Sequence, residues 1–263
     1  MDIGRRSFLT STLGFASLVT LPGTIKAALT SRPRVVLFDA FPVFDPRPVA
    51  TLVKQLFPTQ GEVLAELWRT KQFEYTWLRT VSDQYRNFWD VTRDALHFGC
   101  HTLKLDLSQT DEDRLMAAYL QLKPWPDAPD ALRRMKQAGL KLGFLSNFTT
   151  GMLQANIHGS GLDGVFDHVL STDQAGAFKP DPRAYRLGVD VFGVSKQEAV
   201  FVAFAGWDAA GAAAFGYPTF WVNRFGQPAE ELGFAADATG ATLTALLGFV
   251  QAKISRGQRP DGS

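Results

Sequence analysis

The sequence predicts an α/β protein built on a doubly wound parallel sheet, with an all-helical segment inserted after the first strand. Three observations support this fold class. Short apolar runs, which favour buried strands, alternate with helical patterns from residue 129 onward. These runs end at polar residues, as strands do at the functional edge of such sheets. Between residues 46 and 123 the apolar spacing is helical throughout.

The first strand is expected at residues 34–39, where four apolar residues run without alternation and end at Asp39. Such a run is typical of a strand that is buried on both faces. A carboxylate in the middle of a core costs several kcal/mol, so Asp39 is expected at the carboxyl end of the strand. Ligands bind at that end of open α/β sheets, although this stretch taken alone favours a helix-capping or turn aspartate.

Residues 46–123 are expected to form the helical insert, bounded by proline-rich linkers at 44–48 and 123–126. Apolar residues recur at helical spacing at 49–57, 64–78, 85–98 and 111–122. Ser108 or Thr110 is expected to cap the last of these helices. The remaining parts, 31–45 and 124–263, then form the α/β core.

After the insert, strands are expected at 140–145, 166–170, 199–204 and 218–222, connected by right-handed helical crossovers. Ser146 and Asn147 follow one of these strands, Asp208 follows another, and Lys179 lies in a loop between them. Because the carboxyl ends of parallel strands share one edge of the sheet, these residues are expected to meet Asp39 in one crevice.

Two carboxylates, a hydroxyl, an amide and an ammonium around one crevice suggest covalent catalysis by a carboxylate. Taken singly, each residue has a plainer explanation: Ser146 and Asn147 as helix caps, Lys179 as a solvated lysine, and Asp208 as an N-cap. Their shared placement at successive strand ends favours the catalytic interpretation.

Composition argues against several other classes of protein. The net charge of +1, without a basic stripe, gives no reason to expect nucleic acid as a partner. The single cysteine, Cys100, excludes an intramolecular disulfide. His97 and His101 are separated by one helical turn, but no third ligand accompanies them, so neither a metal nor another cofactor is expected.

Residues 1–30 have the pattern of an export signal. Arg5 and Arg6 are followed by an uncharged, apolar run at 10–22, which is too short to span a bilayer, and then by small residues at 27–28. The arginine pair resembles a twin-arginine signal, which predicts a periplasmic protein that meets a membrane only through an uncleaved leader. A membrane tether or a disordered tail is the alternative.

Four motifs resemble the successive motifs of the haloacid dehalogenase superfamily, and more narrowly those of the (S)-2-haloacid dehalogenases. They are Phe38-Asp39-Ala40-Phe41, Leu145-Ser146-Asn147, Lys179-Pro180-Asp181-Pro182-Arg183-Ala184-Tyr185 and Trp207-Asp208-Ala209-Ala210-Gly211-Ala212. Leu67-Trp68-Arg69 and the stretch 72–79 are similar to that family's helical cap. The resemblance covers the chain from Arg34 to its end.

In that family an aspartate displaces halide with inversion, and water then hydrolyses the ester to a 2-hydroxy acid without a metal. The resemblance implies that Asp39 is the nucleophile, that Lys179 positions it, and that Asp208 pairs with Lys179 and helps to activate water. It also implies a substrate-binding set: Arg69 for the halide, Ser146 and Asn147 for the carboxylate, Tyr185 for hydrogen-bonding support and Trp207 as an apolar wall. The implied partner is a short 2-haloacid or another small carboxylate, and the family often forms homodimers.

The chain departs from the family pattern at positions that matter for ester hydrolysis. Ala203-Phe204-Ala205 stands where the family usually has Ser-Ser-Asn, and Pro42-Val43 stands where it has Gly-Thr. Loss of one oxyanion donor typically slows a reaction about 100- to 1000-fold. A degenerate binder of small carboxylates with little turnover therefore stays open as an alternative. A magnesium-dependent phosphatase is less favoured, because Phe41 occupies the position of that branch's second aspartate.

Overall fold

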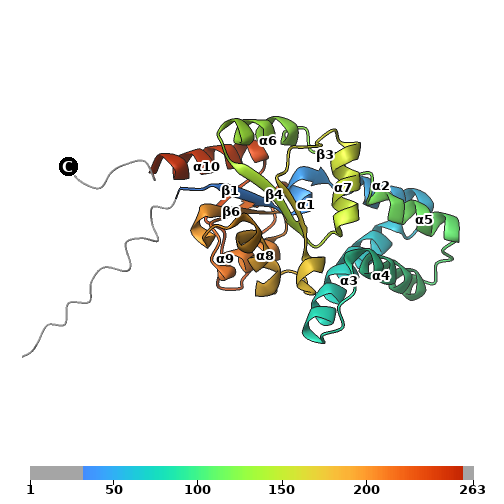
Figure 1. Cartoon of the computed structure of the whole chain (residues 1–263). Helices are drawn as coiled ribbons and strands as arrows, with labels where there is room; N and C mark the ends of the chain where they lie inside the picture. Colours follow the sequence, from blue (N-terminus) through green and yellow to red (C-terminus); the bar gives the residue numbers. More distant parts are fainter. Residues whose placement is uncertain (1–31, 257–263) are drawn as a thin grey trace, which may run out of the picture.

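The computed structural model describes residues 32–256, and the predicted leader lies outside them. The described chain is a three-layer α/β sandwich with a helical lobe at one end (Figure 1). Its main sheet has six parallel strands in the order β5-β4-β1-β6-β7-β8, which confirms the predicted fold class. The strands are β1 (Val35–Phe38), β4 (Lys141–Ser146), β5 (His168–Ser171), β6 (Ala199–Ala203), β7 (Thr219–Val222) and β8 (Ala238–Gly240).

Strand β1 lies in the middle of the sheet, between β4 and β6. All four of its residues are fully buried, as the unbroken apolar run predicts. Phe38 is in register with Phe144 of β4 and Val202 of β6. Asp39 therefore leaves the sheet at the edge where three neighbouring strands end.

Two sequence expectations about the sheet and the helix that follows β6 were wrong. The sheet has a sixth strand, β8, because pairing with β7 makes a strand of Ala238–Gly240 although this stretch has no apolar run. Trp207 and Asp208 do not follow a strand directly but lie in the first turn of helix α9 (Gly206–Phe215). The helix begins that early because β6 already ends at Ala203.

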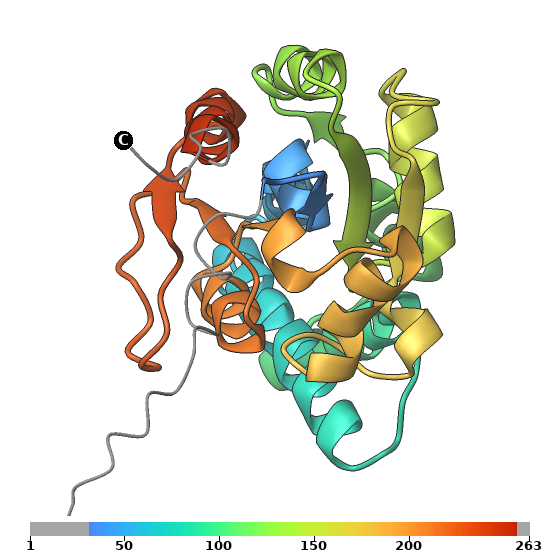
Figure 2. The same cartoon turned by 60° about the vertical axis from the view of Figure 1, so that its left-hand side comes forward.

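Helices cover both faces of the sheet (Figures 1 and 2). On one face, α6 (Ala128–Gln137), α7 (Thr150–Gly159) and α10 (Leu243–Arg256) share a core with Val36 and Phe38. On the other face, α8 (Pro182–Phe192) and α9 pack against Val35 and Leu37. Alternate side chains of β1 thus enter opposite layers, and both layers hold the strand end at Asp39 in place.

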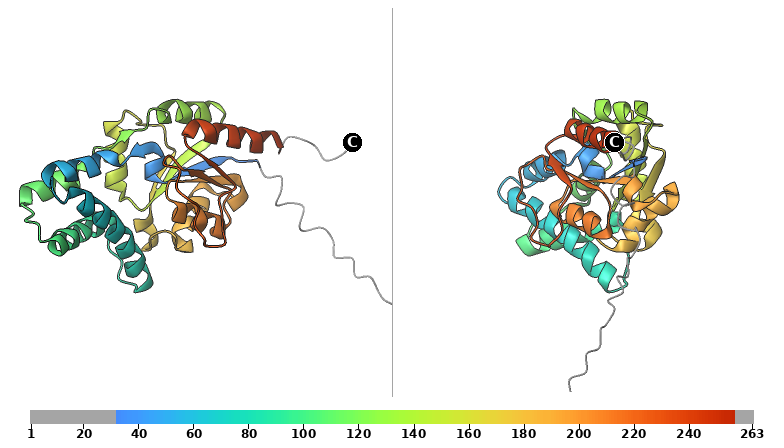
Figure 3. Two further views of the ribbon diagram at one scale, coloured as in Figure 1. Left: turned by 180° about the vertical axis from the view of Figure 1, so that it is seen from behind. Right: turned by 90° about the vertical axis from the view of Figure 1, so that its left-hand side faces the viewer.

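The helical lobe consists of α2 (Arg47–Leu56), α3 (Gly61–Val81), α4 (Phe88–Leu103) and α5 (Gln109–Ala118). On α3 the buried positions beyond Gly61 recur every four residues, at Leu64, Trp68, Gln72 and Thr76. Leu78, which was expected on the same apolar face, is 61% exposed. Ser108, not Thr110, is the N-cap of α5. The lobe and the last turn of α10 lie at opposite ends of the molecule (Figure 3).

The lobe joins the rest of the chain through two short antiparallel strands, β2 (Phe44–Asp45) and β3 (Lys123–Pro124), where only irregular linkers were expected. Trp125 follows β3, and its indole N–H donates to the carbonyl of Phe41 at 2.9 Å. The connection to the lobe is thereby tied to the turn that follows Asp39. No helix within residues 32–256 has the length and apolar character needed to cross a membrane.

Candidate active site

Asp39 directly follows the last residue of β1 and is the N-cap of the four-residue helix α1 (Ala40–Val43). Its backbone N–H donates to the carbonyl of Val202 at 3.1 Å, which extends the sheet by one bond. Its Oδ2 atom accepts a hydrogen bond from the Phe41 amide at 3.2 Å. The capping interpretation is therefore correct, and the cap orients the same carboxylate that the sequence marks as reactive.

Lys179 lies between two carboxylates. Its Nζ atom donates to Oδ1 of Asp39 at 2.9 Å and to Oδ2 of Asp208 at 2.6 Å, and its side chain is only 1% exposed. Burial works to lower the pKa of Lys179, but the charges of Asp208 and Asp39 outweigh it and raise the pKa above its ordinary value. The ammonium therefore stays charged beside the nucleophile.

Asp208 is fixed on both of its oxygens. Oδ2 accepts from Lys179, and Oδ1 accepts from the Tyr185 hydroxyl at 2.7 Å. Burial raises the pKa of Asp208 to about 6, against the opposing effects of the Lys179 charge and the Tyr185 hydrogen bond. Burial and the Asp208 charge raise the pKa of Tyr185 well above its ordinary value, so the phenol stays a donor. This geometry makes Asp208 the counter-ion of Lys179, and its contact with water stays a prediction.

Ser146 and Asn147 follow each other in the chain but contact different groups. The Ser146 hydroxyl donates to Oδ1 of Asp39 at 3.0 Å. Oδ1 of Asn147 accepts from the Lys179 backbone amide at 3.1 Å and from the Thr172 hydroxyl at 3.3 Å. Asn147 therefore holds the loop that carries Lys179, while its buried Nδ2 atom has no protein partner among the described residues.

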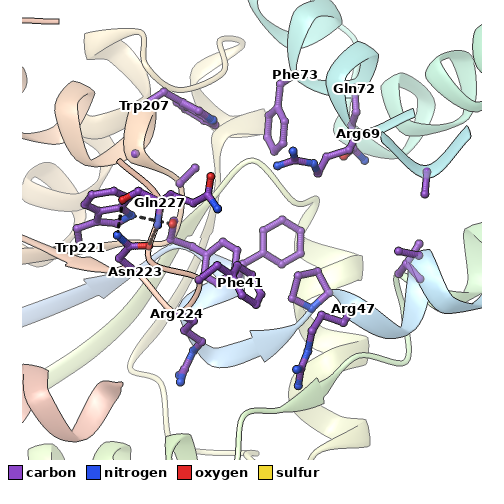
Figure 4. Close-up of a pocket in the computed structure, with 18 of the residues that line it drawn as sticks. Phe41, Arg47, Arg69, Gln72, Phe73, Trp207, Trp221, Asn223, Arg224 and Gln227 are labelled. Carbon is purple, nitrogen blue, oxygen red and sulfur yellow. Dashed lines mark hydrogen bonds between the residues drawn. The ribbon is translucent and has the colours of Figure 1, made fainter. Parts of the chain in front are cut away.

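A cavity of about 620 Å³ lies between the lobe and the sheet edge. Arg69 and Phe73 of α3 point into it from the lobe, opposite Trp207 and Phe41 (Figure 4). Asp39 is not among the lining residues, but its neighbour Phe41 is, so the cavity adjoins the nucleophile turn. Within residues 32–256 the Arg69 guanidinium forms neither an ion pair nor a hydrogen bond, which leaves it available to an anion.

The structure thus divides the predicted site residues into two groups. Six of them, Asp39, Ser146, Asn147, Lys179, Tyr185 and Asp208, form one buried polar cluster. Arg69 and Trp207 instead lie on the wall of the cavity. Among residues 32–256 no three or more His, Cys, Asp or Glu side chains gather as ligands for a metal ion.

The cavity has an aromatic lining, of which only Trp207 was predicted from the sequence. Its members come from the lobe, the nucleophile turn and the ends of β6 and β7, and they include Phe41, Trp68, Tyr119, Phe204 and Trp221. Aromatic residues at such positions are usually part of a core, so nothing in the local pattern distinguishes a cavity wall. Only their convergence in space does.

Comparison with known proteins assigns this fold and site to a family. The model of the haloacid dehalogenase-like hydrolases matches residues 34–216. The chain is 39% identical over 216 residues to haloacetate dehalogenase H-2 of Moraxella sp. (strain B), an alignment that covers 82% of this chain and 96% of that protein. It is also 39% identical over 225 residues to the (S)-2-haloacid dehalogenase of Pseudomonas sp. (strain YL), covering 85% and 97%. The chain therefore belongs to the haloacid dehalogenase-like hydrolases.

Solved structures of L-2-haloacid dehalogenases are also similar to this chain. The crystal structure of an L-2-haloacid dehalogenase superposes with a TM-score of 0.82 at 42% identity and covers 84% of this chain and 100% of that one. The L-2-haloacid dehalogenase of Xanthobacter autotrophicus with chloropropionic acid covalently bound gives a TM-score of 0.78 at 34% identity, covering 83% and 98%.

Proposed function

We propose that the protein hydrolyses short (S)-2-haloalkanoic acids to 2-hydroxy acids through an ester on Asp39. One observation carries this proposal: the Asp39 carboxylate is held by Ser146 and Lys179 beside a cavity into which Arg69 points. The relatives support the substrate class, since they include (S)-2-haloacid dehalogenases, one of which holds chloropropionic acid covalently.

The hydrogen bonds of Asp39 indicate which oxygen reacts. Oδ1 accepts from both Ser146 and Lys179, whereas Oδ2 accepts only one longer bond, from the Phe41 amide. Oδ2 therefore attacks the carbon that bears the halogen. The carbon–halogen bond breaks, and the halide leaves with the bonding electrons toward Arg69. A guanidinium stabilises that anion more strongly as water is excluded from the cavity.

Hydrolysis of the ester uses donors that are already in place. Water attacks Cγ of Asp39, and negative charge develops on Oδ1, which Ser146 and Lys179 contact at 3.0 and 2.9 Å. The bond between Cγ and the ester oxygen then breaks, the water gives up a proton and the departing alkoxide takes one. Ser146 and Lys179 belong to the family motifs that this chain retains, whereas Ala203 and Ala205 provide no further side-chain donor.

A carboxylate-binding protein with little turnover is the second candidate. It is favoured by Ala203 and Ala205, which provide no side-chain donor at the end of β6. In a binder of this kind the halide would be displaced, but the ester on Asp39 would persist because Ala203 and Ala205 provide no side-chain hydrogen bond to the attacking water.

One experiment separates the two candidates: the protein is incubated with (S)-2-chloropropionate, and free chloride and intact protein mass are measured together. Repeated chloride release with unmodified protein is expected, and Asp39→Asn should abolish it. One chloride per protein with a lasting adduct on Asp39 would establish the second candidate. Absence of both chloride and adduct would overturn the proposed function.

A further inference from the structure

The cavity beside Asp39 is much larger than a short haloacid requires. (S)-2-chloropropionate has about six non-hydrogen atoms. If each atom takes ~30 Å³, the volume of one molecule in liquid water, the acid fills roughly 180 Å³. The cavity measures about 620 Å³, within the range of about 300–1,000 Å³ that is typical of sites for drug-sized ligands. Most of the space is therefore left for a part of the substrate that does not react.

Aromatic rings form much of the wall around this space. Phe73 lies 5.3 Å from Trp207, measured between ring centroids, and Phe41 lies 5.8 Å from Phe204. The rings come from both the lobe and the core, and they are Phe41, Trp68, Phe73, Tyr119, Phe204, Trp207, Trp221 and Phe225. Such a wall favours an apolar ligand, and flat rings favour an aromatic one, through stacked and edge-to-face contacts.

The charges around the cavity leave one cation for an anionic group. Arg47 is paired with Asp45 at 2.6 Å and Arg224 with Asp127 at 3.0 Å, and both guanidinium groups point away from Phe41 (Figure 4). Glu230 also lines the cavity, and it is exposed. Among the described lining residues, Arg69 is the unpaired cation. Apart from Arg69 and these three side chains, the described lining residues carry no charge.

Two of the departures from the family motif, Phe204 and Ala205, lie on the same wall. Phe204 and Ala205 line the cavity at positions where the (S)-2-haloacid dehalogenases usually carry a serine and an asparagine. This exchange removes two polar side chains and adds a ring. A change that weakens the binding of water at this end of β6 also makes the cavity more apolar.

We propose that the enzyme prefers (S)-2-haloacids with a large aromatic substituent on the reacting carbon, such as (S)-2-chloro-3-phenylpropionate, over the short acids. The inference rests on the proposed function and concerns only the substituent. The reacting carbon lies at Asp39, the halide faces Arg69, and the substituent extends past Phe41 among the rings. Burial of a phenyl group predicts a gain of about tenfold or more in kcat/KM.

The test compares chloride release from (S)-2-chloro-3-phenylpropionate and (S)-2-chloropropionate under the same conditions. A kcat/KM at least tenfold higher for the phenyl acid is expected. Equal values, or a preference for the short acid, would overturn the inference and leave the proposed function standing.

Filling the cavity should change this preference. Ala65 on α3 and Ala50 on α2 both line the cavity, so Ala65→Phe and Ala50→Phe each occupy part of it. Each variant should lower the ratio of the two kcat/KM values about tenfold. Ala214→Phe is the control, because Ala214 is exposed on α9 and is not part of the wall. An unchanged ratio in both folded cavity variants would count against the inference.

A binding measurement that needs no turnover distinguishes failure of the proposed function from failure of the substituent site. 3-Phenylpropionate should quench tryptophan fluorescence at a concentration about tenfold lower than propionate does, since Trp68, Trp207 and Trp221 line the cavity. If no acid releases chloride but this binding preference holds, the proposed function fails and the substituent site stands. If propionate binds as well as the phenyl acid, the substituent site is refuted.

Discussion

At the scale of single residues, the site is organised around the buried ammonium of Lys179. Burial of a charge costs several kcal/mol, which is recovered only where geometry and further hydrogen bonds are good. Here both carboxylates lie within 2.9 Å of Nζ, and Ser146 and Tyr185 donate to the same carboxylates. One positive charge shared between two negative ones leaves the cluster with an excess negative charge beside the substrate. The cluster therefore positions and activates Asp39 more than it stabilises the fold.

The ionisation of Asp208 predicts an acid limit on activity. When Asp208 is protonated, Lys179 pairs with Asp39 alone and holds the nucleophile more tightly. Since burial raises the pKa of Asp208 to about 6, kcat/KM should fall as the pH drops through this value. In Tyr185→Phe the carboxylate loses a donor to its charged form, so this acid limb should move upward by about one pH unit. Initial rates of chloride release between pH 4 and 9 test both statements.

The raised pKa of Asp208 also affects the free energy of unfolding, in the opposite direction: acid lowers activity but favours the folded state. The folded state favours the protonated form of Asp208, so its contribution to the free energy of unfolding is present below the ordinary pKa of 3.8 and is lost as the pH rises toward 6. The difference in unfolding free energy between the wild type and Asp208→Asn, followed from pH 4 to 7, isolates this contribution.

For activity, an acid limb of kcat/KM that stays at the same pH in Tyr185→Phe would contradict the assignment of this limb to Asp208.

At the scale of elements, helix α9 carries Asp208 and depends on close packing against the start of α8. A β-carbon placed on Gly211 would lie 2.6 Å from the Tyr185 hydroxyl and 2.7 Å from Cβ of Pro180. Tyr185 belongs to the buried polar cluster, and Pro180 directly follows Lys179, another member of that cluster. The small residue in α9 is thus what allows the Tyr185 hydroxyl to reach Asp208.

Gly211→Ala should therefore affect activity and stability together. We expect the free energy of unfolding to fall by about 1–3 kcal/mol through overpacking. The acid limb of kcat/KM should also move upward, as in Tyr185→Phe, because the new methyl group displaces the same hydroxyl. Urea denaturation and the pH profile measure the two effects.

Gly248→Ala is the matched control. Gly248 lies in helix α10, is exposed and has no heavy atom within 4 Å of an added β-carbon. This substitution should stabilise the protein by about 0.5–1 kcal/mol through helix propensity and leave the pH profile unchanged. If both glycine variants behave alike, close packing at Gly211 is not the reason for the effect.

Elements were predictable from the sequence where a single local pattern determined them. The unbroken apolar run of β1 and the helical spacing of the lobe are such patterns, and each gave the correct element. Strand β8 has none, because its three residues form a strand only by pairing with β7. Trp207 and Asp208 were not expected within a helix, because no side chain caps the start of α9: its N-cap is Ala205.

At the scale of the whole molecule, the polar cluster was predictable and the cavity was not. Parallel strands bring their carboxyl ends to one edge, so Ser146 and Asp39 were expected to meet from topology alone. The cavity depends on how the lobe is placed over that edge, and Trp68 and Tyr119 reach it from helices whose own patterns specify only a buried face. The size and the aromatic lining of the cavity therefore depend on the tertiary arrangement of the lobe and the sheet, and no single motif predicts them.

The leader is the part of the molecule for which only the sequence provides an argument, and residues 1–30 lie outside the described structure. We predict that the full chain, expressed in a bacterium with a twin-arginine pathway, is exported to the periplasm. Replacing both arginines with lysine, as Arg5→Lys/Arg6→Lys, keeps the charge but removes the guanidinium pair, and the protein should then stay in the cytoplasm. Chloride release from (S)-2-chloropropionate in separated cell fractions reports where the folded enzyme is. The variant matches the wild type in charge and length, so a shift between fractions is due to the arginine pair. Equal distribution of the two proteins would contradict a twin-arginine signal, because a tether or an unstructured tail does not depend on that pair.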